Sequence, residues 1–104
     1  MIDIRPTTYT VTGLPEDDVN STIWALRIEW RGPGDCWAVL RHSYALSHTG
    51  WWDWEPSPSN RTDEFKTTHR FTLTEAMERS RAEYPKLIIN GLCVRNGELV
   101  EAPQ

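Results

Sequence analysis

The side chains of this chain that could ligate a metal ion are few and scattered. They are His42, His48, His69, Cys36, Cys93 and Asp53. Structural metal sites repeat their ligands at short spacings such as C-x-x-C or H-x-x-x-H, and none of these residues follows such a pattern. The sequence therefore predicts no metal and no cofactor. We expect two reduced, buried thiols, whereas an oxidising compartment would favour a disulfide between them.

The motifs that supply a catalytic nucleophile are also missing. The chain has no G-x-S-x-G elbow, no P-loop and no G-x-G-x-x-G, so we predict no catalytic residue. Adjacent His69 and Arg70 could bind an anion or exchange a proton, but such an arginine more commonly pairs with a carboxylate. The alternative to a non-catalytic protein is a small enzyme or ligand-binding domain with a tryptophan-lined pocket. Its polar residues would be His42, His69, Arg61 and Arg70.

Three tryptophans fall within four residues in the run GWWDWEPSPSNR. If residues 51–55 form a strand, Trp52 and Trp54 share one face, and Trp51, Asp53 and Glu55 share the other. Unpaired carboxylates are costly to bury, so the second face is expected to be the wet one. The alternation therefore predicts Trp51 at the surface and Trp52 and Trp54 in the core. There they would join Trp24, Leu26, Ile28 and Trp30 against the helix.

The favoured binding surface is the wet face of this strand together with the loop that follows it. An exposed tryptophan beside carboxylates suits a protein-binding hot spot or a cage for a cationic group. Alternatively, residues 56–62 fold over Trp51, with Pro56 or Pro58 stacked on its ring. The candidate binding residues are Trp51, Asp53, Glu55, Arg61, His69 and Arg70.

These residues need a sheet to position them. The clearest strand covers residues 22–30. Its alternation puts Trp24, Leu26, Ile28 and Trp30 on one face and the more polar set Ala25, Arg27 and Glu29 on the other. Further strands are predicted over 9–12, 37–44 and 51–55, and less regular ones over 64–71 and 87–89. The strands over 22–30, 37–44 and 51–55 should form an antiparallel meander. Asn96-Gly97 predicts a two-residue hairpin between 92–94 and 98–100.

One helix is predicted over residues 73–84. Thr72 and Glu75 match a capping box, and Pro85 ends the helix. The apolar stripe comprises Leu73, Ala76, Met77, Ser80 and Tyr84. We therefore expect a single α+β domain over 1–104: an antiparallel sheet of four to six strands with one helix packed on one face. Residues 101–104 are expected to be frayed.

The charge balance argues against a phosphate-neutralising protein, because 11 basic residues face 15 acidic ones, a net charge of −4. Nucleic-acid binding or mimicry therefore ranks only as a third alternative. No apolar run approaches the roughly 18 residues of a membrane span, and the N-terminus lacks the pattern of a signal peptide. We expect a cytoplasmic protein that does not enter membranes.

Residues 24–65, WALRIEWRGPGDCWAVLRHSYALSHTGWWDWEPSPSNRTDEF, and residues 68–85, THRFTLTEAMERSRAEYP, resemble small uncharacterised accessory proteins of phages that infect actinobacteria. In those proteins strands precede one helix. The resemblance implies a phage protein that acts in the host cytoplasm on a host protein, and it carries over no catalytic residue. The sequence thus favours non-catalytic binding to a host factor or to itself. An open sheet face would favour a homodimer.

Overall fold

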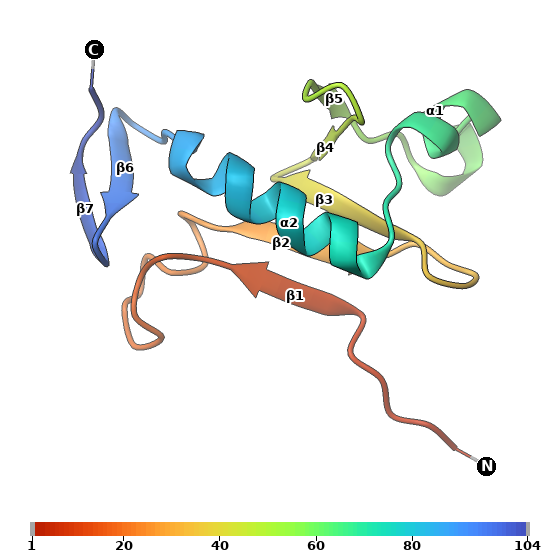
Figure 1. Ribbon diagram of the computed structural model, residues 1–104, viewed down its shortest axis with the longest axis horizontal. Coiled ribbons are helices and arrows are strands. Elements are labelled where there is room, and N and C mark those ends of the chain that lie inside the picture. The colour runs from red at the N-terminus through yellow and green to blue at the C-terminus, as the bar shows by residue number, and fades with distance from the viewer. Residues whose placement is uncertain (1, 104) are drawn as a thin grey trace.

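The computed structural model describes residues 2–103 of the chain. Figure 1 shows a long helix lying across an antiparallel sheet, with a separate hairpin at one end. The sheet has five strands in the order β1-β2-β3-β4-β5, and β6 and β7 form the hairpin. This is the α+β meander that the sequence predicts. The elements are β1 Thr8–Val11, β2 Leu26–Trp30, β3 Trp37–Arg41, β4 Tyr44–Leu46, β5 Trp52–Trp54, α1 Asp63–Thr68, α2 Leu73–Glu83, β6 Leu92–Arg95 and β7 Glu98–Glu101.

The strand predicted over residues 37–44 is in fact two strands. The chain reverses at His42, whose φ of 54° lies in the left-handed region, and β4 returns antiparallel to β3. Residues on both faces of β3 are buried, so hydrophobic alternation gave no sign of a break. The turn also lacks the glycine that usually marks a tight hairpin. The sheet consequently has one strand more in its meander than the sequence indicates.

The two faces of the sheet are covered by different helices. On one face, Ile28, Val39 and Leu46 pack with Ala76 of α2. On the other, Ala38, Leu40 and Ala45 pack against Phe65 of α1. Because side chains alternate along a strand, β3 places apolar residues on both faces and lies at the centre of the fold.

The prediction of a strand over residues 64–71 is wrong, because residues 63–68 form α1. Thr62 caps this helix: its hydroxyl accepts a hydrogen bond from the Phe65 amide at 3.1 Å. Asp63 and Glu64 follow in the first turn, where they favour the positive end of the helix dipole. Only Phe71 keeps a strand-like contact, an isolated antiparallel bridge to Trp37. The preceding loop contains a single 3-10 turn at Pro58–Asn60.

The predicted capping box at the start of α2 is confirmed. The Thr72 hydroxyl accepts from the Glu75 amide at 3.2 Å, and the Glu75 carboxylate accepts from the Thr72 amide at 2.9 Å. The helix buries Ala76 and Ser80, as its apolar stripe predicts. It ends at Glu83, where a 3-10 turn through Pro85 takes over.

We expect Thr72→Ala to lower the free energy of unfolding by about 0.5–2 kcal/mol, because it removes the side-chain cap of α2. Urea denaturation would measure the change. Thr74→Ala is the matched control, since Thr74 is exposed in the same turn, and it should stay within about 0.5 kcal/mol of the wild type. Equal effects of the two substitutions would show that the cap contributes nothing.

Trp24 does not belong to the sheet as predicted, because β2 begins only at Leu26. Residues 21–24 form a turn, and Trp24 packs with Leu14 and Val94 in a second core beneath the hairpin. Its indole Nε1 donates to the Leu92 carbonyl at 3.2 Å. The ring therefore joins the hairpin to the rest of the domain.

The predicted hairpin is confirmed, with Asn96 and Gly97 at φ values of 52° and 80°, as its turn requires. The predicted strand over 87–89 is reduced to an isolated bridge between Ile89 and Leu92. Glu101 ends β7, and the Ala102 amide donates to the Gly91 carbonyl. Gln104, expected to be frayed, lies outside the described residues.

Candidate functional site: an arginine cluster beside an open sheet edge

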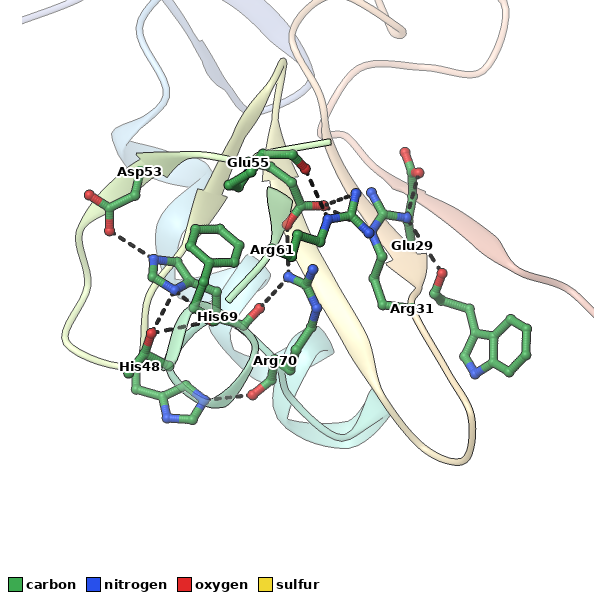
Figure 2. A network of polar contacts seen from close by, with 12 residues as sticks. Glu29, Arg31, His48, Asp53, Glu55, Arg61, His69 and Arg70 are labelled. Carbon is green, nitrogen blue, oxygen red and sulfur yellow. Dashed lines mark hydrogen bonds and ion pairs between the residues drawn. The ribbon is translucent and has the colours of Figure 1, made fainter. Parts of the chain in front are cut away.

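Glu55, which follows β5, is the centre of a cluster of charged side chains (Figure 2). Its side chain is only 6% exposed. One carboxylate oxygen accepts from Arg31 Nε and the other from Arg70 Nη1, each at 2.8 Å, and Arg61 Nη2 lies 3.5 Å away. The expectation that Glu55 lies on a wet surface is therefore wrong. Three guanidinium groups make its burial favourable, because charge-assisted hydrogen bonds replace the lost water.

The cluster continues along β2 and carries more positive than negative charge. Arg31 Nη1 also donates to Glu29 at 3.2 Å, Glu29 pairs with Arg27, and Arg27 Nη2 donates to the His42 carbonyl. Four arginines and two glutamates give a local charge of 4 − 2 = +2, in a chain whose net charge is −4. Sequence reasoning placed Arg27 and Glu29 on the polar face of their strand but did not connect them with Glu55.

The surroundings of Glu55 and Arg61 shift the pKa of each. Burial alone raises the pKa of Glu55, but the hydrogen bonds from Arg31 and Arg70 outweigh it, so the pKa lies below its ordinary value of 4.5. Burial lowers the pKa of Arg61; the charge of Glu55 opposes this effect, while those of Arg31 and Arg70 add to it. Arg61 thus lies close to one carboxylate and to two other guanidinium groups.

Both ring nitrogens of His69 lie beside groups of the protein itself. Nε2 lies 2.8 Å from Asp53 Oδ2, and Nδ1 lies 3.0 Å from the Phe65 carbonyl oxygen. The imidazole is buried and stacks on the Phe65 ring at a centroid distance of 4.0 Å. Both ring nitrogens are occupied, so His69 connects β5 to α1 and leaves no nitrogen facing a substrate.

The three neighbouring tryptophans differ in their burial. Trp51 is 72% exposed, as predicted, and the alternative in which Pro56 or Pro58 covers it does not occur. Instead, Arg61 Nε donates to the Pro56 carbonyl at 2.9 Å and closes that loop on itself. Trp52 is half-buried against the α2 core, with the Arg41 guanidinium 4.9 Å above its ring.

The prediction that Trp54 and Trp30 belong to the core is wrong. Trp54 is 61% exposed, and Trp30 is also exposed. Trp54 does lie on the face of the sheet that α2 covers, opposite Tyr44. However, α2 packs mainly on β2 and β3, and Trp54 at the end of the edge strand β5 stays in solvent. The exposed Tyr44 and Trp54 rings contact each other edge-on at 5.7 Å.

The outer edge of β5 is open. Hydrogen bonds from the Ser47 amide to the Trp51 carbonyl and from the Glu55 amide to the Ser43 carbonyl show which residues face β4. Bonded and non-bonded pairs alternate in an antiparallel ladder. The main-chain groups of Trp52 and Trp54 therefore point away from β4, and no hydrogen bond within residues 2–103 engages them.

A cavity of about 270 Å³ lies beside the arginine cluster. It brings together two of the four polar residues of the ligand-binding alternative, His42 and Arg61; the other two, His69 and Arg70, do not line it. Its charged and polar lining comprises Arg27, Glu29, Arg31, His42, Ser43, Glu55, Ser57 and Arg61, and Leu40, Trp54 and Pro56 complete it. Sequence reasoning missed Arg31, Ser43 and Trp54, which reach this cavity from separate segments.

The cysteines are both free thiols. Cys93 is buried as expected, whereas Cys36 is only half-buried because it lies in the turn before β3. Within residues 2–103, no three of the His, Cys, Asp and Glu side chains gather as a metal ion requires. None of the helices in this range is long and apolar enough to cross a membrane.

No family model matches the chain, and neither a curated protein nor a solved structure matches it. The geometry of the open edge and of the arginine cluster is therefore what supports a function.

Proposed function

We propose that this protein is a non-catalytic binding protein that takes up an extended segment of another protein along the open edge of β5. The observation that carries the proposal is the outward-facing main chain of Trp52 and Trp54 beside exposed aromatic rings. An added strand would form hydrogen bonds with these groups, and the rings would give it affinity and specificity. The resemblance to phage accessory proteins would make the partner a host protein.

The two sides of β5 would select different residues in the partner. On the side of the sheet that faces α2, Tyr44 and Trp54 form an apolar surface, which favours apolar residues opposite Trp54. On the other side, Asp53 carries a half-exposed carboxylate, which favours a basic residue opposite it. The expected partner segment thus alternates apolar, basic and apolar residues.

The same carboxylate disfavours self-association through this edge. If two copies paired β5 with β5 so that Trp52 of each met Trp54 of the other, the two-fold axis would place Asp53 opposite its own copy. Like charges directly opposite each other destabilise a strand pair. A different protein is therefore the preferred partner, although a homodimer through another surface would be compatible with it.

Selection of random peptides on the wild-type protein would test this function. We expect enriched peptides to alternate apolar, basic and apolar residues. Trp54→Ala should weaken their binding by about 2 kcal/mol or more, a typical hot-spot effect. Ile88→Ala is the control, because Ile88 is an exposed apolar residue outside the strands, and it should leave affinity unchanged. Asp53→Lys should shift the selected peptides from basic to acidic.

Amide hydrogen exchange would show whether binding occurs by strand addition. The bound peptide should protect the amides of Trp52 and Trp54, whereas the amide of Asp53, which faces β4, should change little. Peptides that bind Trp54→Ala as tightly as the wild type, or that leave the Trp52 and Trp54 amides unprotected, would contradict the proposal.

A further inference from the structure

The sheet has a second open edge at β1, on the side opposite to β5 (Figure 1). The Trp30 amide donates to the Thr7 carbonyl, and this pair continues the register of β1 with β2. Because bonded and non-bonded pairs alternate, the main-chain groups of Thr8 and Thr10 point away from β2. No hydrogen bond within residues 2–103 engages them. We propose that this edge binds a second copy of the chain, so that the two sheets join β1 to β1 in a symmetric dimer.

The pairing that uses this edge fully places Thr8 of each copy opposite Thr10 of the other. Each of these threonines would then exchange both of its main-chain hydrogen bonds with the residue opposite. The two Tyr9 residues would meet on the two-fold axis, on the face of the sheet where Tyr9 packs against the α2 core. Aromatic pairs across two strands stabilise an antiparallel ladder.

A groove beside this edge would receive the apolar side chains of the added strand. It has a volume of about 370 Å³ and is lined by residues of β1 and α2. Tyr9, Val11, Ile28 and Met77 give it an apolar lining. Arg81 is the one charged residue that lines it, and because Arg81 is exposed its guanidinium group can stay in water.

The charge of this edge favours a second copy as the occupant. Strand β1 lies in the run PTTYTVTGLP, residues 6–15, which holds no charged residue. Edge strands are usually protected by a charge, a proline or a bulge, and Thr8–Val11 has none of these. Two copies of β1 therefore meet without like charges, whereas Asp53 would meet its own copy at β5. A neutral strand is complementary to itself but offers no charge that would select a different partner.

The segment before β1 would enlarge the interface. A stable dimer buries roughly 800 Å² on each copy, more than four residues of an edge strand supply. Ile2 and Ile4 are 94% and 99% exposed, and Figure 1 shows their segment projecting from the start of β1, away from α2. In an antiparallel pair the start of one strand lies beside the end of the other, so this segment would lie along the partner. Asp3 and Arg5 pair with each other at 3.2 Å, so it adds no net charge.

Analytical ultracentrifugation over a range of protein concentrations would test the proposal. We expect a monomer–dimer equilibrium. Thr10→Pro should weaken the dimer about tenfold or more, because proline lacks the amide that each copy would donate to the other. That amide points away from β2, so the variant should keep the fold of the monomer, as its circular dichroism spectrum would verify. Trp54→Ala is the control, because Trp54 lies on β5, which this dimer leaves free, and it should not change the dimer.

A wild-type protein that stays monomeric up to about 1 mM would overturn the proposal. It would equally fail if Thr10→Pro dimerised as tightly as the wild type, or if Trp54→Ala abolished the dimer. If Thr10→Pro does not fold, amide hydrogen exchange of the wild type provides the test. Raising the protein concentration should slow exchange at Thr8 and Thr10 but change little at Tyr9, whose amide faces β2. Exchange at Thr8 and Thr10 that is independent of concentration would exclude β1 as the interface.

Discussion

Replacing Glu55 by glutamine should lower the free energy of unfolding by about 3–5 kcal/mol. The substitution keeps the shape of the side chain but removes the negative charge that Arg31, Arg61 and Arg70 share. Arg70, whose side chain is as buried as that of Glu55, would then face other cations without a counter-charge. Burying an unpaired charge is among the most destabilising single changes in a folded protein. Urea denaturation at neutral pH would measure the loss.

The effect of Glu55→Gln should also depend on pH. The pKa of Glu55 is lower in the folded protein than its ordinary value of 4.5, so the folded state binds the proton less readily than the unfolded state. The stability that Glu55 contributes is therefore fully present above pH 4.5 and is lost as the pH falls through the lowered folded pKa. We expect the difference between wild type and variant to shrink in acid.

Glu16→Gln is the matched control for both measurements, since Glu16 is an exposed glutamate outside the strands and helices. It should change the free energy of unfolding by less than about 0.5 kcal/mol at neutral pH. A Glu55→Gln protein as stable as Glu16→Gln, or a difference that stays constant from neutral to acid pH, would show that the arginine cluster does not hold the fold together.

Trp37→Ala should cost about 3–5 kcal/mol, whereas Trp54→Ala should cost less than about 1 kcal/mol. Trp37 is 7% exposed, packs with Ile28 and Phe71, and donates from Nε1 to Asp35 at 2.9 Å. Its loss would leave a cavity between β3 and α2. Because a domain of this kind is stable by only about 5–15 kcal/mol, the Trp37 variant would be close to unfolding.

Thermal and urea denaturation of both variants would test this difference. The small effect of Trp54→Ala is also what makes it useful in the binding experiments, since lost binding then reflects the surface and not the fold. Similar losses in the two variants would mean that Trp54 is buried in solution. In that case the open edge of β5 would be covered, contrary to the proposed function.

Local features of the sequence were enough to predict much of the fold. The alternation of Leu26, Ile28 and Trp30 marks β2, the Thr72–Glu75 capping box marks the start of α2, and Asn96-Gly97 marks the hairpin. Each of these signals lies within a few residues and has one dominant physical cause. The reversal at His42 and the helix α1 were missed, since neither has a strong breaker nor a long apolar period.

The sequence by itself determined that Trp52 and Trp54 share one face of a strand and that Trp51, Asp53 and Glu55 share the other, because side chains alternate with a period of two. Only the tertiary structure decided which of them are buried. Since β5 is at the edge of the sheet, α2 leaves Trp54 in solvent. Arg31, which follows β2, and Arg61 and Arg70, which follow β5, surround the carboxylate of Glu55. This side chain is therefore buried. Burial depends on long-range neighbours, which a local pattern does not contain.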